Sequence, residues 1–188
     1  DLGMCSILLD YGEEKDGCEF NKPLIEPHQI LRRSSRTIKR LYRENADISA
    51  VEVESCRSLY IPTMYSGNYH YGPFRALEDD VYKYWQKHLV ASIPNLTIKN
   101  HPKSIKPELG VRVEDRWLED CIGDYDLLIL DYYSTAASIA VFSDKPVMFF
   151  DIGLRNMSSR YTELLRKRCH YRTIDLCEEL SSQINDVL

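Results

Sequence analysis

The chain has 188 residues, of which 44% are hydrophobic and 28% charged, and its net charge at pH 7 is -5. These values are typical of one soluble globular domain, or of one large domain with an appendage. The negative charge does not favour nucleic acid as a partner. The longest apolar runs fall well short of the roughly 18 residues that a membrane-spanning helix needs.

The start of the chain and its cysteines favour a cytoplasmic protein. The first residues have neither a basic leader nor a small-residue cleavage site, so we expect no signal peptide, and the chain resembles a domain cut from a longer protein. The cysteines are unevenly spaced without a CxxC pair, which predicts reduced thiols rather than a disulfide framework or a zinc site. They are Cys5, Cys18, Cys56, Cys121, Cys169 and Cys177.

The first 50 residues predict a strand-helix segment that would link to an N-terminal domain outside this chain, and residues 51–188 predict a domain of their own. "CSILLDYG" (5–12) has the composition of a strand, and residues 27–45 have the pattern of a helix with Leu31 and Ile38 facing inward. We expect a boundary near residues 46–56.

A basic stripe runs along the helix expected over residues 27–45. The residues at helical spacing are Arg32, Arg36, Lys39 and Arg43. Such a stripe is usually a solvated face. The alternative is contact with an anionic membrane surface or a lipid-linked acceptor, which would place the protein at the inner face of the membrane.

From residue 58 onward, short apolar runs alternate with longer amphipathic ones. On the helix expected over 77–93, apolar and aromatic spacing predicts that Val81, Tyr84, Trp85, His88 and Leu89 share a buried face. Strands are expected over 58–63, from 95 to the residue before His101, over 126–133 and over 146–150, with 171–174 as a further candidate. The other helices are expected over 113–125, 134–143, 160–169 and 175–188.

This alternation predicts an α/β fold with a mainly parallel sheet and right-handed crossovers. In such sheets ligands bind beyond the carboxyl ends of the strands. Three of these strand ends carry polar side chains, and each has a functional and a structural interpretation.

The strand expected over 126–133 contains Asp131 and Tyr133 at its end and is followed by Ser134 and Thr135. A helix that begins at either hydroxyl residue presents unpaired N–H groups and a partial positive charge, and can hold a phosphate. Ala136 and its neighbour Ala137 keep that turn narrow. The simpler interpretation is that one hydroxyl caps the helix.

A second strand end is "NHPK", in which His101 and Pro102 follow a buried strand and Lys103 comes next. An imidazole fixed at the edge of the sheet can donate to a phosphate oxygen or stabilise a leaving group. A lone histidine is more often structural, and the sequence leaves both interpretations open.

The third strand end is the loop "PTMYSGNYHYGPF" (62–74), whose glycine lets the backbone approach a ligand. Its tyrosines could stack on a base or sugar. The pattern is neither GxGxxG nor a Walker motif, so it supports neither a dinucleotide site nor an ATPase. The residues concerned are Thr63, Ser66, Gly67 and Asn68, with Tyr65, Tyr69 and Tyr71 as the stacking candidates.

Taken together, these strand ends resemble the carboxyl-terminal half of GT-B transferases. They are most similar to teichoic-acid type CDP-glycerol glycerophosphotransferases and related capsule and surface-polysaccharide enzymes. His101-Pro102 matches the His-Pro motif of that family, and "LYIPTMYSG" (59–67) is similar to the strand and loop that open its nucleotide-binding domain. Its second motif is matched by Asp131, Tyr133, Ser134, Thr135, Lys145 and Pro146, and the resemblance covers residues 57–151.

The resemblance implies a Rossmann-like domain, one half of a GT-B architecture, that binds a CMP-, CDP- or UDP-linked donor without a metal or cofactor. The acceptor site and catalytic base would lie in a second domain outside this chain. The family carries an acid on the helix after the hydroxyl pair to hold the ribose, whereas this sequence has Ile139 there, and Tyr132 is an additional tyrosine. Two alternatives stay open: a sugar-nucleotide 2-epimerase and a non-catalytic binding or assembly domain.

Overall fold

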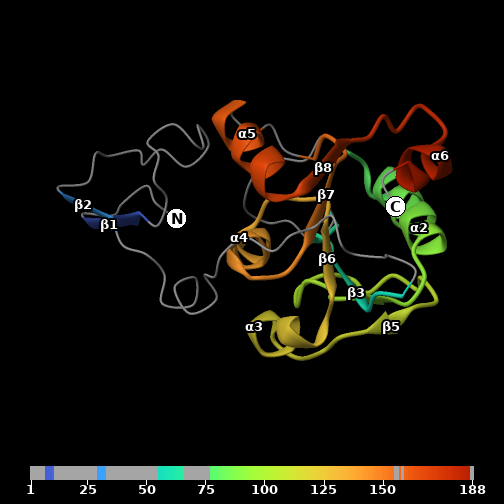
Figure 1. The fold of residues 1–188 in the computed structure, drawn as a ribbon, viewed down its shortest axis with the longest axis horizontal. Helices are drawn as coiled ribbons and strands as arrows, with labels where there is room; N and C mark the ends of the chain where they lie inside the picture. Colours follow the sequence, from blue (N-terminus) through green and yellow to red (C-terminus); the bar gives the residue numbers. More distant parts are fainter. Residues whose placement is uncertain are drawn as a thin grey trace.

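A six-stranded, entirely parallel sheet forms the centre of the fold (Figure 1). The computed structural model describes residues 7–10, 29–32, 55–65, 77–154, 157 and 159–186. The inner strands are apolar runs buried on both faces, as parallel sheets require. The strands are β3 (Ser58–Ile61), β4 (Leu96–Ile98), β5 (Arg112–Val113), β6 (Leu127–Leu130), β7 (Val147–Asp151) and β8 (His170–Thr173).

The strand order β5-β4-β3-β6-β7-β8 is that of a Rossmann-like fold. From β3 the chain steps to β4 and β5 on one side, then returns to β6 on the other side of β3. Tyr60 of β3 is therefore paired with both Ile98 of β4 and Ile129 of β6. The reversal between β3 and β6 is the topological switch point, beyond which ligands bind in open α/β sheets.

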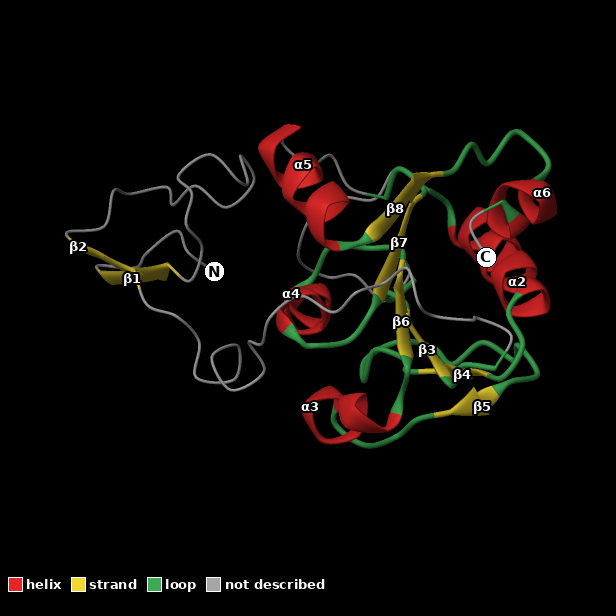
Figure 2. Cartoon of the chain, in the orientation of Figure 1, coloured by secondary structure: helices red, strands yellow, loops and turns green. Residues whose placement is uncertain are grey.

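Helices cover both faces of this sheet (Figure 2). On one face lie α2 (Asp79–Ser92) and α6 (Leu180–Asn185), which pack against each other. The other face carries α3 (Leu118–Cys121), which continues into the 3-10 turn η4 (Ile122–Asp124), together with α4 (Thr135–Phe142) and α5 (Ser159–Arg168). The predicted α/β class with flanking helices is confirmed.

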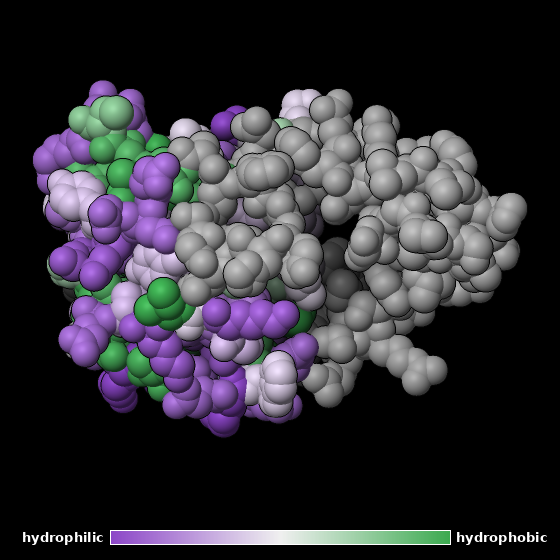
Figure 3. Space-filling view, turned by 180° about the vertical axis from the view of Figure 1, so that it is seen from behind, coloured by the Kyte–Doolittle hydropathy of each residue, from purple (hydrophilic) through white to green (hydrophobic). Residues whose placement is uncertain are grey.

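Side-chain alternation along the strands builds a core on each face. Tyr60 and Ile129 belong to the cluster under α2 and α6, whereas Leu59 and Leu128 belong to the cluster under α3, α4 and α5. Hydrophilic side chains dominate the described surface on the side shown in Figure 3, with small apolar areas between them. None of the helices in the described ranges is long and apolar enough to cross a bilayer.

Two further strands, β1 (Ile7–Asp10) and β2 (Gln29–Arg32), pair in parallel as a separate sheet. The strand predicted over 5–12 is confirmed at its centre, but the helix predicted from residue 27 is wrong over 29–32. A short run such as "QILR" fits both the two-residue period of a strand and the 3.6-residue period of a helix. Here pairing with β1 makes it a strand. Arg32 ends a strand instead of opening a helical stripe. The rest of the stripe, Arg36, Lys39 and Arg43, and the boundary expected near 46–56 lie wholly or largely outside the described residues.

The sequence prediction also missed features of the main domain. β5 was not predicted, because its two residues are exposed and form no apolar run. The helix expected over 113–125 is consequently reduced to α3 and η4. The last helix starts only at Leu180, because the side chain of Glu179 caps it there by accepting two backbone N–H bonds.

The buried face of α2 differs from the predicted one. The structure buries Tyr82, Trp85, Gln86 and Leu89, whereas Val81 is 39% and Tyr84 53% exposed. Tyr82 and Gln86 can face the interior because their polar tips find hydrogen-bond partners there. A prediction from apolar spacing alone therefore assigns Val81 and Tyr84 to the buried face in place of Tyr82 and Gln86.

Among the cysteines that the structure describes, all are free thiols. Cys56, Cys121 and Cys169 are buried, and Cys177 is exposed. Burial raises the pKa of Cys121 to about 11 and that of Cys169 to about 12, so both stay protonated near neutral pH. Cys5 and Cys18 lie outside the described residues.

Leu128→Ala tests the central position of β6. Leu128 is fully buried in the sheet, so we expect the variant to lower the free energy of unfolding by about 2–5 kcal/mol. Leu164→Ala, at a side chain that is 50% exposed on α5, is the matched control and should change it by less than about 0.5 kcal/mol. Urea unfolding of both variants measures the difference, and equal losses would contradict the assigned core.

Candidate functional site

The carboxyl ends of β3, β4 and β6 lie side by side at the switch point of the sheet. Thr63 follows β3, His101 follows β4, and Ser134 follows β6. The ladder continues past β4, because Lys99 N–H donates to the Tyr60 carbonyl at 2.8 Å. The topology therefore brings the three predicted strand ends to one edge of the sheet.

Helix α4 begins at this edge without a side-chain cap. Ser134 is its N-cap residue, with an extended backbone (φ -138°, ψ -174°), and its hydroxyl makes no capping hydrogen bond. The first turn carries no acidic residue. Ser138 N–H donates to the Ser134 carbonyl at 3.0 Å, which closes the first helical turn. The earlier N–H groups point out of the helix toward the carboxyl edge, where an anion can accept from them.

Three other helices, α2, α3 and α6, place carboxylates at their own starts, whereas α5, like α4, has no acid in its first turn. Glu179 accepts from the backbone N–H groups of Ser181 and Ser182 at 3.0 and 2.6 Å at the start of α6. Asp79 and Asp80 lie in the first turn of α2, and α3 has two acids in its first turn. These carboxylates complement the positive end of the helix dipole. At α4 no carboxylate of the first turn has that role.

His101 sits in a turn that fixes its tautomer. Its Nδ1 accepts from Lys103 N–H at 3.2 Å, and its carbonyl accepts from Ser104 N–H at 2.9 Å. Pro102 occupies the second turn position, which its fixed φ favours. Partial burial and, secondarily, the charge of Lys103 lower the pKa of His101, so the ring is neutral near pH 7. Because Nδ1 is an acceptor, the proton resides on Nε2, which can donate to a ligand.

The β4 loop is locally basic in a chain of negative net charge. Residues 99–106 contain Lys99, Lys103 and Lys106 and no acid. Lys106 is paired with Asp115 at 3.3 Å, and Lys99 Nζ donates to the Glu114 carbonyl at 3.4 Å. Lys103 is exposed next to His101. The loop therefore favours an anionic ligand.

Asp131 lies inside the core and is only 2% exposed. Its carboxylate accepts from Tyr82 Oη at 3.1 Å, from Trp85 Nε1 at 3.0 Å and from the Tyr60 hydroxyl. Burial raises the pKa of Asp131 to about 6, although these hydrogen bonds act in the opposite direction. The structure thus places this predicted ligand-binding residue in a buried network on the α2 side of the sheet.

The Asp131 network reaches the loop after β3. Thr63 N–H donates to Tyr82 Oη at 3.1 Å, and the Tyr65 hydroxyl donates to Gln86 Oε1 at 2.5 Å. Gln86 Nε2 in turn lies 3.4 Å from Tyr60 Oη. Tyr65 is therefore 7% exposed and engaged in the interior, where it cannot stack on a base as predicted. The network fixes Thr63, α2 and the end of β6 relative to one another.

The remaining predicted residues divide into three groups. Tyr133 is partly exposed, and its ring meets Tyr161 edge-on at 5.2 Å between centroids, while Thr135 is exposed at the start of α4. Ile139 lies within α4, is 7% exposed and packs into the core between α4 and the sheet, so the position where GT-B enzymes of the resembled type carry a ribose-binding acid faces the core. The residues Ser66, Gly67, Asn68, Tyr69 and Tyr71 lie outside the described ranges.

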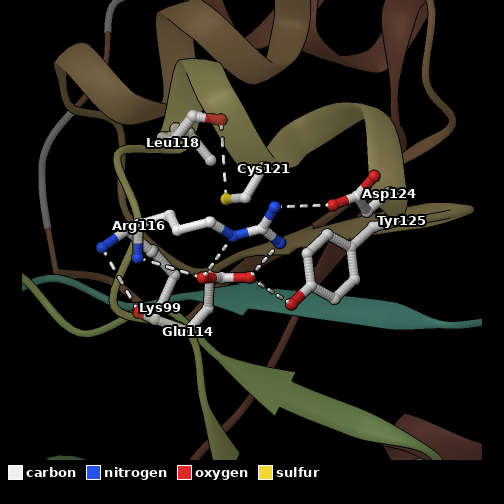
Figure 4. Close-up of polar contacts among 7 residues, drawn as sticks. All are labelled: Lys99, Glu114, Arg116, Leu118, Cys121, Asp124 and Tyr125. Carbon is white, nitrogen blue, oxygen red and sulfur yellow. Dashed lines mark hydrogen bonds and ion pairs between the residues drawn. The ribbon is translucent and has the colours of Figure 1, made fainter.

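A cluster of charged groups on the α3 side holds the connection from β5 to β6 (Figure 4). Glu114 accepts from the Arg116 guanidinium at 2.7 Å and from Tyr125 Oη at 3.0 Å, while Arg116 also pairs with Asp124 at 2.8 Å. Hydrogen bonds from Arg116 lower the pKa of Glu114 to about 2. These groups satisfy one another, so the cluster is structural, and spacing alone did not reveal it.

Within the ranges that the structure describes, no three His, Cys, Asp or Glu side chains are grouped to hold a metal ion. Comparison of the chain with protein-family models, curated proteins and solved structures found no match. The site that emerges combines the open start of α4, the Nε2–H of His101 and the Lys103 ammonium. All three favour an anionic group at the carboxyl edge of the sheet.

The buried carboxyl of Asp131 predicts a specific pH dependence of stability. Its pKa of about 6 is above the ordinary value of 3.8, so the folded protein binds this proton more tightly than the unfolded chain. This contribution to the free energy of unfolding is therefore fully present below pH 4. It is lost as the pH rises through 6, by about 3 kcal/mol.

Asp131→Asn removes the titration while keeping the side-chain shape. The stability of the wild type relative to this variant should fall between pH 4 and 6 and stay level above pH 7. Urea unfolding of both proteins across pH 4–8 measures the difference. Parallel pH profiles would show that Asp131 does not titrate in this way.

Proposed function

We propose that this chain is the nucleotide-donor-binding half of a GT-B type transferase that builds a bacterial surface polysaccharide or teichoic-acid type polymer. The donor is a sugar or polyol phosphate activated as a CMP, CDP or UDP derivative. The observation that carries the proposal is the start of α4, which lies at the switch point without a side-chain cap or a first-turn acid. The resemblance of residues 57–151 to that family supplies the substrate class.

In this proposal the diphosphate binds across the ends of β6 and β4. The N–H groups of the first turn of α4, with the hydroxyls of Ser134 and Thr135, bind phosphate oxygens. His101 donates through Nε2, and Lys103 adds a positive charge. These groups stabilise the negative charge that grows on the departing phosphate as the donor bond breaks. The general base belongs to the acceptor-binding half, and no residue of this chain is assigned that role.

Asp131 has an indirect part in this proposal. It holds the end of β6 against β3 and α2 from inside the core, and α4 begins within four residues of it. Position 139 is an isoleucine packed into the core, so it cannot supply a carboxylate that binds the ribose. Phosphate recognition is consequently the central part of the proposal.

Titration calorimetry with CMP, CDP and UDP tests the proposal. We expect the protein to bind at least one of the diphosphates more tightly than the monophosphate, because the second phosphate reaches additional donors. The preferred nucleotide identifies the base of the donor. Absence of heat with all three nucleotides would reject the proposal and favour a binding or assembly domain.

Ser134→Ala tests whether the start of α4 is the phosphate site. We expect the variant to weaken binding of the preferred diphosphate by about 3–10-fold, because a hydroxyl donor to a charged phosphate is lost. Its melting temperature should stay within about 2 °C of wild type, because the hydroxyl makes no capping bond.

Ser92→Ala is the matched control for this experiment, since Ser92 ends α2 at the opposite edge of the sheet. It should leave nucleotide affinity unchanged. Equal affinity of wild type and Ser134→Ala would show that the hydroxyl is not in the site.

A further inference from the structure

Asn100 carries a buried side-chain amide whose nitrogen has no hydrogen-bond partner in the described part of the chain. It stands between the end of β4 and His101, and the residue is 8% exposed. None of the residues that the structure describes is hydrogen-bonded to its Nδ2. A buried donor without a partner destabilises the folded state, and most buried polar groups in proteins are paired. The amide therefore needs a physical explanation.

Two other buried atoms without partners differ from Asn100 in position and context. Ser58 Oγ lies at the first residue of β3, at the amino edge of the sheet. Arg168 Nη1 belongs to a guanidinium whose other nitrogens already donate to three backbone carbonyls, those of Val141, Ser143 and Lys145. Asn100 lies at the carboxyl edge, where α/β proteins bind ligands.

The sheet register places Asn100 at the level of the other strand-end groups, at the carboxyl edge of the sheet. Ile98 and Ile129 both pair with Tyr60, so two residues further along each strand Asn100 stands at the same level as Asp131. The Asp131 carboxylate accepts three hydrogen bonds, whereas the side-chain N–H groups of Asn100 find no acceptor among the described residues. The next residue after Asn100 is His101, whose Nε2–H is also free to donate.

We infer that Asn100 is a further binding residue of this site and that its side-chain amide donates to a phosphate oxygen of the bound nucleotide. The inference rests on the proposed function and deepens it. A phosphate over the end of β4 would meet the Asn100 amide, His101 Nε2–H and the Lys103 ammonium together. The last torsion of an asparagine side chain is soft, so the amide can turn its N–H groups toward the ligand.

Asn100→Ala separates a ligand-binding role from a structural one. We expect the dissociation constants for CDP or UDP, and for inorganic pyrophosphate, to rise about tenfold, because a donor to a charged group is lost. Affinity for cytidine or uridine should stay as in wild type. The melting temperature of the free protein should not fall, because no hydrogen bond is removed.

Ser58→Ala is the matched control, since it also removes a buried atom without a partner, but at the opposite edge. It should not change the affinity for any of these compounds. A loss of stability in Asn100→Ala with unchanged diphosphate affinity would overturn the inference, because the amide would then have a structural partner such as a water. Unchanged affinity and stability would overturn it as well.

A measurement on the wild type does not depend on the folding of the variant. On addition of CDP, UDP or pyrophosphate, the side-chain N–H signals of Asn100 in a nitrogen-proton NMR spectrum should shift downfield. Saturating diphosphate without such a shift would overturn the inference while leaving the proposed function in place. If the wild type binds no nucleotide and no pyrophosphate, both fail. Binding of pyrophosphate alone, with loss in Asn100→Ala, would support the inference and reject the nucleotide donor.

Discussion

The buried carboxylate of Asp131 is the constraint on which the arrangement of the strand ends depends. A carboxylate in the interior requires donors, and these come from β3 through Tyr60 and from α2 through Tyr82 and Trp85. The end of β6 can therefore take only one position relative to those elements. Because Tyr82 also accepts from the backbone of Thr63, the loop after β3 is held by the same group of residues.

The parallel sheet brings the starts of the helices that follow its strands to one edge, and each start needs an acceptor for its unpaired N–H groups. Carboxylates in the sequence meet this need at α2, α3 and α6. At α4 the chain instead supplies Ser134 and Thr135 and no acid. The neutral, oriented His101 and the exposed Lys103 follow β4, which is separated from β6 by β3. The start of α4 without an acid, together with the basic groups that follow β4, is the physical basis for an anion site.

The sequence alone allowed us to predict the α/β class and the convergence of the three strand ends at one edge of the sheet. Buried apolar runs such as 127–130 identify parallel strands, and the carboxyl ends of such strands meet at one edge. It was not sufficient for the role of Asp131, because a carboxylate after a strand looks the same whether it faces a ligand or the core. The signal was present in Tyr82 and Trp85, whose polar tips need partners when they are buried.

Other features depend on contacts that no local pattern records. β5 exists because residues 112–113 pair with β4, although both residues are exposed and form no apolar run. β2 forms by pairing with β1, although the same residues also fit a helical period. The Glu114 cluster joins residues on either side of α3 through contacts that the sequence pattern does not record. Asn100 was overlooked because its missing partner is a property of the folded chain.

The most direct test of the anion site at the carboxyl edge is a nitrogen-proton NMR titration of the wild-type protein with CDP and UDP. The account predicts that backbone signals of Thr135, Ala136 and His101 shift with a common dissociation constant. Signals at the amino edge, such as those of Ser92 and Ser58, should stay in place. Shifts confined to the amino edge, or saturable binding that leaves the start of α4 unchanged, would contradict it.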